Sequence, residues 1–247
     1  MSRVSRGFRI TGKVIKYLVF LLIFTVIGLL LWRVFSAGDP DSMSTLAPNE
    51  KLCAAYEAKG EELYLFRQEQ RTITSAEDNY GYFSVTDCVF IPDANQIQIV
   101  FRYNNSTIRS LAEDYGLEEV PSREEELFDV SLTVATDLTP DVDDDNAGND
   151  PDAVRFTRVH ATQVTSDTKN MYNYRRLVFD LDEAELSLAD LLDSGELLAV
   201  YADIYYKEDI QYEEPAYGTL CLYDYLSEKR SAKLTQDDRR ALEQALQ

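Results

Sequence analysis

Side chains that could bind a metal ion gather between residues 141 and 152. Hard cations such as Ca²⁺ take several oxygen ligands, and carboxylates at alternating positions can wrap around one ion. The carboxylate and amide side chains with this spacing are Asp141, Asp143, Asp145, Asn149 and Asp152. The pattern indicates a candidate Ca²⁺ loop, and Ca²⁺ is the only cofactor that the sequence suggests.

The spacing of these residues resembles an EF-hand loop, but it departs from that loop in several ways. Asn146 stands where the EF-hand needs glycine, Asp152 where a longer glutamate reaches the ion, and Pro151 comes just before it. The flanking sequences also look like strands and not like helices. The alternative is a solvated hairpin loop of like charges that binds no cofactor.

His160 is the only histidine, so a Ser-His-Asp triad or a histidine-containing zinc site would have to use it. No Cys-x-x-Cys pair or His-x-x-x-His spacing supports zinc. Because His160 lies in a strand pattern, we expect it to be a structural side chain. The chain has an odd number of cysteines, Cys53, Cys88 and Cys221. Because Cys88 and Cys221 both lie in strand-like runs, a disulfide between these two is one possible pairing.

Acidic and aromatic residues give two further candidates. Paired carboxylates can hydrolyse glycosidic bonds, but 44 acidic residues always supply some close pair, and the runs 118–119 and 124–126 are most simply solvated. Tyrosines near the C-terminal strands could form a recognition face, although aromatic residues also favour strands. These tyrosines are Tyr201, Tyr205, Tyr206, Tyr212, Tyr217, Tyr223 and Tyr225.

A long apolar segment, residues 14–35, stands close to the N-terminus. At about 1.5 Å per residue such a helix measures roughly 33 Å, enough to cross a hydrocarbon core of about 30 Å. Lys16 and Arg33 bracket its uncharged run, with Tyr17 and Trp32 just inside. The segment predicts a transmembrane helix. A cleaved signal peptide is the alternative, but Arg33 and Phe35 do not suit a cleavage region.

Charge divides the chain at the end of this segment. Residues 1–35 hold six basic residues and no acidic one, whereas the rest carries 18 basic and 44 acidic residues, a net charge of −26. The positive-inside tendency keeps the N-terminus in the cytoplasm and exports the remainder. An acidic exported part has no positive surplus to displace counterions from phosphates, so we expect no nucleic-acid partner.

The remaining pattern predicts a mostly β domain. Phe128, Val130, Leu132 and Val134 alternate with polar residues, and about seven such short strands follow one another without a βαβ rhythm. An extracytoplasmic, antiparallel, immunoglobulin-like β-sandwich with short peripheral helices is therefore expected, with a partly closed barrel as the alternative. The predicted parts are a basic tail (1–13), a transmembrane helix (14–35), a linker (36–48), a helical stalk or packing helix (49–70), the β-sandwich (71–230) and a C-terminal helix (231–247).

These features name no reaction. We expect a single-pass protein of the cell membrane, held in the lipid bilayer by residues 14–35, whose outer domain is a non-catalytic binding or accessory module. Its partner would be a protein of a surface or envelope complex. The alternative is a surface-anchored hydrolase that uses paired carboxylates on glycans or peptides.

Overall fold

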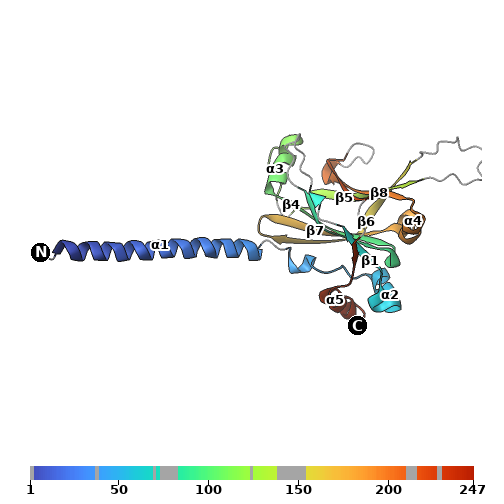
Figure 1. Cartoon of the computed structure of the whole chain (residues 1–247). Coiled ribbons are helices and arrows are strands. Elements are labelled where there is room, and N and C mark those ends of the chain that lie inside the picture. Colours follow the sequence, from blue (N-terminus) through green and yellow to red (C-terminus); the bar gives the residue numbers. More distant parts are fainter. Residues whose placement is uncertain are drawn as a thin grey trace, which may run out of the picture. The chain divides into compact units, whose positions relative to one another are not determined.

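The structure is a computed structural model of the chain. It describes residues 3–36, 39–68, 71–72, 83–122, 125–137, 154–209, 216–226 and 230–247. Contacts between residues divide the chain into two compact units, Met1–Asp39 and Pro40–Gln247. The second unit contains all the strands (Figure 1).

The first unit consists of one helix, α1 (Arg3–Ser36). Its large apolar side chains between Tyr17 and Trp32 are between 45% and 74% exposed. Within the described part of the chain, no helix is found that combines the length and the apolar character needed to cross a membrane. The expected span, residues 14–35, extends at both ends beyond residues 16–32, the part of α1 whose side chains are described.

The second unit is built on one curled antiparallel sheet. Its strands follow the order β10-β1-β3-β4-β7-β6-β5-β8-β9, and the short β2 also pairs with β3. The strands are β1 (Leu65–Gln68), β2 (Arg71–Thr72), β3 (Ser84–Ile91), β4 (Gln96–Asn104), β5 (Phe128–Asp137), β6 (Val154–Lys169), β7 (Tyr172–Asp180), β8 (Leu197–Tyr206), β9 (Gly218–Asp224) and β10 (Arg230–Ala232).

The mostly β, antiparallel class that the sequence predicts is confirmed, but the immunoglobulin-like sandwich of two separate sheets is not found. The long strand β6 explains the difference. Its residues 154–160 pair with β5, whereas residues from Ala161 to Lys169 pair with β7, with a bulge between Ala161 and Gln163. A bulge bends a strand and increases its twist, so β6 carries the sheet around a corner and joins both halves.

The curl brings strands from distant places in the order into contact. The ring of Tyr223 on β9 lies 5.7 Å from that of Phe90 on β3 and 6.3 Å from that of Phe66 on β1. Alternating apolar residues of both halves, such as Leu132 and Phe101, are buried in one cluster between them. Burying such side chains contributes about 1.5–3 kcal/mol each, so this inner cluster is the main source of stability.

Two helices close opposite ends of the inner cluster. Helix α3 (Asn105–Asp114) directly follows β4, and α4 (Leu188–Ser194) follows β7 by way of η4 (Leu181–Ala184). Gln96 pairs with Asp180 at one end of these strands and Asn104 with Tyr172 at the other, so the helices lie at opposite ends. Both insert apolar side chains into the cluster, namely Ile108 and Leu111 from α3 and Leu188 and Leu191 from α4.

The outer face of the half formed by β1, β3, β4 and β7 is covered. Its covering elements are η1 (Asp41–Met43), α2 (Glu50–Lys59) with η2 (Gly60–Glu62), and α5 (Gln236–Ala245). Leu52 and Leu242 pack with Leu65, Val89 and Ile91 in a second apolar cluster, which lies away from the inner one. Helices α2 and α5 lie beside each other below the sheet (Figure 1). The two remaining short helices are η3 (Pro92–Ala94) and η5 (Lys207–Asp209).

Residues 40–49, here called the strap, run across this covered face. The amide of Ala47 donates to Gln98 Oε1 at 2.8 Å, and Gln98 Nε2 donates back to the Ala47 carbonyl at 3.1 Å. Leu46 and Ala47 are each only 3% exposed. The segment expected as a linker, residues 36–48, therefore belongs to the domain from Pro40 onward, while residues 37–38 lie outside the described residues.

A buried carboxylate fixes the strap to α5. Asp238 is fully buried, and its Oδ1 accepts the Leu46 amide at 2.7 Å. Its Oδ2 accepts the amide and the hydroxyl of Thr235, at 2.9 and 2.7 Å, and lies 3.6 Å from Arg67 Nη2. Asp238 thus caps its own helix, binds the strap and balances the charge of a partly buried arginine on β1.

We predict that Asp238→Ala lowers the free energy of unfolding by about 2 kcal/mol or more, because it leaves the buried Leu46 amide and the Thr235 amide without their acceptor, while Arg67 keeps its ion pair with Asp87. The neighbouring Asp237→Ala serves as the control, since its carboxylate is 67% exposed and forms an ion pair with Arg240. That change costs less than about 1 kcal/mol. Urea denaturation of the full chain measures both values, and equal losses would show that Asp238 does not hold the strap.

Candidate functional site

The outer face of the other half, here called the open face, is formed by the first part of β6 together with β5, β8 and β9. Val130, Leu132 and Val134 of β5 point into the inner cluster, so Ser131 and Thr133, which alternate with them, point outward. The register places Arg158 and Tyr201 on either side of Thr133, and His160 and Asp203 on either side of Ser131.

The open face carries exposed side chains along β6. Phe156 is 65% exposed, and Arg158 and His160, two and four residues further on, are exposed as well. The strap, α2 and α5 all pack on the covered half, as their apolar contacts show. Phe156, Arg158 and His160 therefore face outward from a domain that is strongly acidic as a whole.

Polar contacts hold the centre of the open face in one arrangement. The hydroxyl groups of Thr133 and Thr219 donate to the two oxygens of Asp203, at 2.5 and 2.7 Å. Arg158 Nη2 donates to the Tyr205 hydroxyl at 3.1 Å, with its guanidinium 5.6 Å from the ring centre. Burial raises the pKa of Tyr205, so this phenol stays protonated at neutral pH. The centre of the open face is therefore polar, and its side chains are hydrogen-bonded to one another.

Ser131, His160 and Asp203 form a row across three strands, but the row is not a catalytic triad. A triad needs the imidazole between the serine and the carboxylate, with the serine hydroxyl bonded to the imidazole. Here the serine stands in the middle of the row, and Ser131 Oγ is buried without a hydrogen-bond partner. Asp203 is held by threonines, and His160, expected to be structural, lies exposed on β6.

The acidic loop lies outside the described residues, so the structure gives no ligand geometry for Asp141, Asp143, Asp145, Asn149 and Asp152. The two ends of the loop are described, and Asp137 of β5 pairs with Val154 of β6. The loop thus joins two neighbouring antiparallel strands. Among the described residues, no three His, Cys, Asp or Glu side chains are placed to hold a metal ion.

The Cys88–Cys221 disulfide does not form, and Cys53 is not bonded to either of them. Cys88 belongs to the inner cluster. Cys221 lies between Leu220 and Leu222, whose side chains point into that cluster, so its own side chain points to the outer face. The two cysteines lie on opposite faces of the sheet, which alternation within isolated strands could not reveal.

The glutamate runs do not provide a general acid among the described residues. Glu118, Glu119, Glu125 and Glu126 are exposed, and Glu124 lies outside the described residues. Glu126 accepts a hydrogen bond from Lys207 at 2.8 Å, and this contact lowers the pKa of its carboxyl group. A general acid needs the opposite shift, toward a protonated carboxyl group at neutral pH.

The tyrosines near the C-terminal strands mostly pack within the domain. Tyr205, Tyr206 and Tyr223 are buried, and Tyr201 and Tyr217 are half-buried. Tyr225 is 64% exposed, whereas Tyr212 lies outside the described residues. Only part of the expected recognition face is thus available at the surface. Phe156 on β6, which sequence reasoning did not single out, is also 65% exposed.

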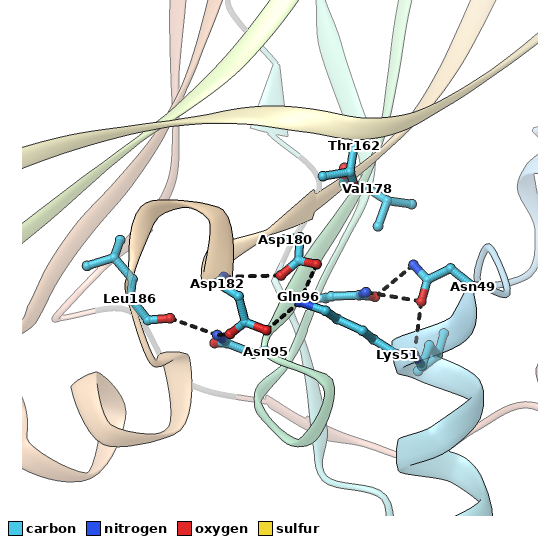
Figure 2. A network of polar contacts seen from close by, with 10 residues as sticks. Asn49, Lys51, Asn95, Gln96, Thr162, Val178, Asp180, Asp182 and Leu186 are labelled. Carbon is cyan, nitrogen blue, oxygen red and sulfur yellow. Dashed lines mark hydrogen bonds and ion pairs between the residues drawn. The ribbon is translucent and has the colours of Figure 1, made fainter.

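A polar network that sequence reasoning missed joins α2 to the end of the sheet (Figure 2). Lys51 Nζ lies 2.5 Å from Asp180 Oδ2 and also contacts Asp182. Asn95, which adopts a left-handed backbone with φ of 51°, donates to the Leu186 carbonyl at 2.7 Å and accepts the Leu188 amide at 2.7 Å. These partners are about ninety residues apart, so no local spacing predicts them.

This network stabilises the fold and has no reactive group at neutral pH among the residues described below. The hydrogen bonds that Lys51 donates to Asp180 and Asp182 raise the pKa of Lys51, so its amine stays charged and cannot act as a base or nucleophile at neutral pH. The hydrogen bond from Lys51, followed by that from Asn95, lowers the pKa of Asp182. Both groups are therefore charged across the neutral range, and they clamp α2 against η4.

We predict that Lys51→Met lowers the free energy of unfolding modestly, by an amount that depends on pH. The lowered pKa of Asp182 stabilises the folded state above about pH 4, and this stabilisation is lost as the pH falls through the pKa of Asp182 in the folded protein. The raised pKa of Lys51 stabilises the folded state below about pH 10, and this stabilisation is lost as the pH rises through the pKa of Lys51 in the folded protein. Because the side chains of Lys51 and Asp182 are 40% and 56% exposed, the loss at pH 7 is below about 1 kcal/mol.

Urea denaturation of the full chain at pH 3 and pH 7 measures the contribution of the Lys51–Asp182 pair, with Lys233→Met, an exposed lysine between β10 and α5, as the control. The difference between wild type and Lys51→Met is expected to shrink at pH 3. A loss of the same size at both pH values would contradict an electrostatic role.

Comparison with known proteins adds no family to this description. No protein-family model, no curated protein and no solved structure matches the chain. The candidate site is thus defined by the side chains of the open face alone.

Proposed function

We propose that the chain is a single-pass membrane protein whose extracytoplasmic β domain is a non-catalytic binding or accessory module of a surface or envelope complex. The observation that carries the binding part is the asymmetry between the two outer faces of the sheet. One is covered by the strap, α2 and α5, and the other presents Phe156, 65% exposed, beside Arg158 and His160.

The anchoring part rests on the sequence. The apolar run of residues 14–35, the charges at Lys16 and Arg33 and the aromatic residues just inside them all suit a bilayer. The basic residues ahead of the run favour a cytoplasmic N-terminus and an exported domain, and the net charge of −26 beyond the run favours solubility of that domain. The partners on this proposal are the bilayer and a protein at the cell surface.

The chemistry of the open face favours recognition of a protein. Exposed aromatic residues and arginines are the side chains that most often dominate protein interfaces. Arg158 is held by Tyr205, so little side-chain freedom is lost when a partner binds. A non-catalytic role is further favoured by Ser131, whose hydroxyl has no hydrogen bond to a base.

Cross-linking in intact cells tests the proposal. A photoreactive phenylalanine analogue at position 156 of the full chain is expected to give one discrete adduct with another protein. The yield should fall about fivefold or more when Arg158→Glu reverses the charge beside it, because charge reversal within an interface weakens binding strongly.

The matched control places the photoreactive residue at position 183, where Glu183 is exposed in η4. It should give no such adduct. Failure to capture any protein at position 156, or equal capture at both positions, would contradict the open face as the binding surface.

A further inference from the structure

Helices α2 and α5 enclose a second candidate surface, a groove of about 560 Å³ on the covered side of the domain. Its floor is formed by Cys53 and Ala54 of α2, together with Ala245 and Leu246 at the end of α5. Leu246 is 40% exposed, and Cys53 is 8% exposed. The floor is therefore apolar and partly open to solvent.

The rim of this groove is acidic. Glu50 and Glu57 both line it and are exposed. They flank Cys53 and Ala54 at spacings of three, four and seven residues, which places all four side chains along one stripe of α2. No lysine or arginine lines the described groove, so the stripe combines apolar atoms with uncompensated negative charge.

The negative charge of the rim acts on the Cys53 thiol in the groove. Burial raises the pKa of Cys53, and the negative charge of Glu57 raises it further. The field of the rim thus reaches the floor. A cation that entered the groove would be attracted by the same field, whereas an anion would be repelled.

We propose that this groove docks a basic amphipathic helix of a partner protein, with the apolar face of that helix on the floor and its lysine or arginine side chains beside Glu50 and Glu57. A helix laid in a groove between two others is a common mode of recognition. The ten residues of α2 span about 15 Å, which matches roughly three turns of a docked helix. This site is separate from the open face, so either can fail without the other.

Peptide binding to the full chain in nanodiscs of uncharged phosphatidylcholine tests the proposal. The probe is a 14-residue helix of leucine, alanine and lysine, and the matched control peptide has glutamate in place of lysine. Fluorescence anisotropy of the dye-labelled peptides measures binding. The basic peptide is expected to bind the full chain, and the acidic peptide is expected not to bind.

Charge variants separate docking from general attraction to an acidic protein. Glu50→Lys/Glu57→Lys should weaken binding of the basic peptide about tenfold, because two charge pairs are lost within one site. Glu119→Lys/Glu183→Lys changes the net charge equally at exposed positions elsewhere and should weaken it less than about twofold.

The Glu50→Lys/Glu57→Lys double substitution is also expected to leave α2 folded. A lysine is unfavourable near the N-terminus of a helix and favourable near its C-terminus, so the two changes nearly cancel. Far-UV circular dichroism checks this, and Glu50→Gln/Glu57→Gln replaces the lysine variant if it unfolds. Equal weakening in both double variants, or no binding of the basic peptide to the wild-type chain, would overturn the proposal.

Discussion

The continuous strand β6 is the constraint on which the rest of the domain depends. Because residues 154–160 pair with β5 and residues from Ala161 pair with β7, both halves of the sheet share one backbone. The bulge between them bends that backbone, and the apolar faces of the two halves meet in the inner cluster. Closing the ends of that cluster with α3 and α4 removes most of its remaining apolar surface from water.

Curling also gives the two outer faces different surroundings. The face of β1, β3, β4 and β7 is covered by segments from both ends of the domain, and Asp238 joins them by binding the strap and capping α5. The face of β5, β6, β8 and β9 instead carries Phe156 and the Arg158–Tyr205 pair. The segments that cover the sheet and the proposed recognition surface therefore lie on opposite outer faces.

Local patterns predicted the elements better than their partners. Alternation identified the strand around Leu132, and the Thr235–Asp238 capping box, visible in the sequence, begins α5 as its residue types indicate. The sequence could not show that Asp238 also binds Leu46, 192 residues away, because that contact depends on tertiary packing. The strap was expected as a linker, since it lacks periodicity, but Gln98 supplies the hydrogen bonds that a neighbouring strand would otherwise provide. The row of Ser131, His160 and Asp203 likewise exists only through strand register.

Docking of the strap onto Gln98 and Asp238 helps to cover one outer face of the sheet. Amide hydrogen exchange measures this docking directly. In the full chain held in a nanodisc, the amides of Leu46 and Ala47 should exchange at least about a hundredfold more slowly than unstructured peptide, because both donate to buried side chains. Exchange of these two amides at the rate of an unstructured linker, with the amides of β4 still protected, would contradict it.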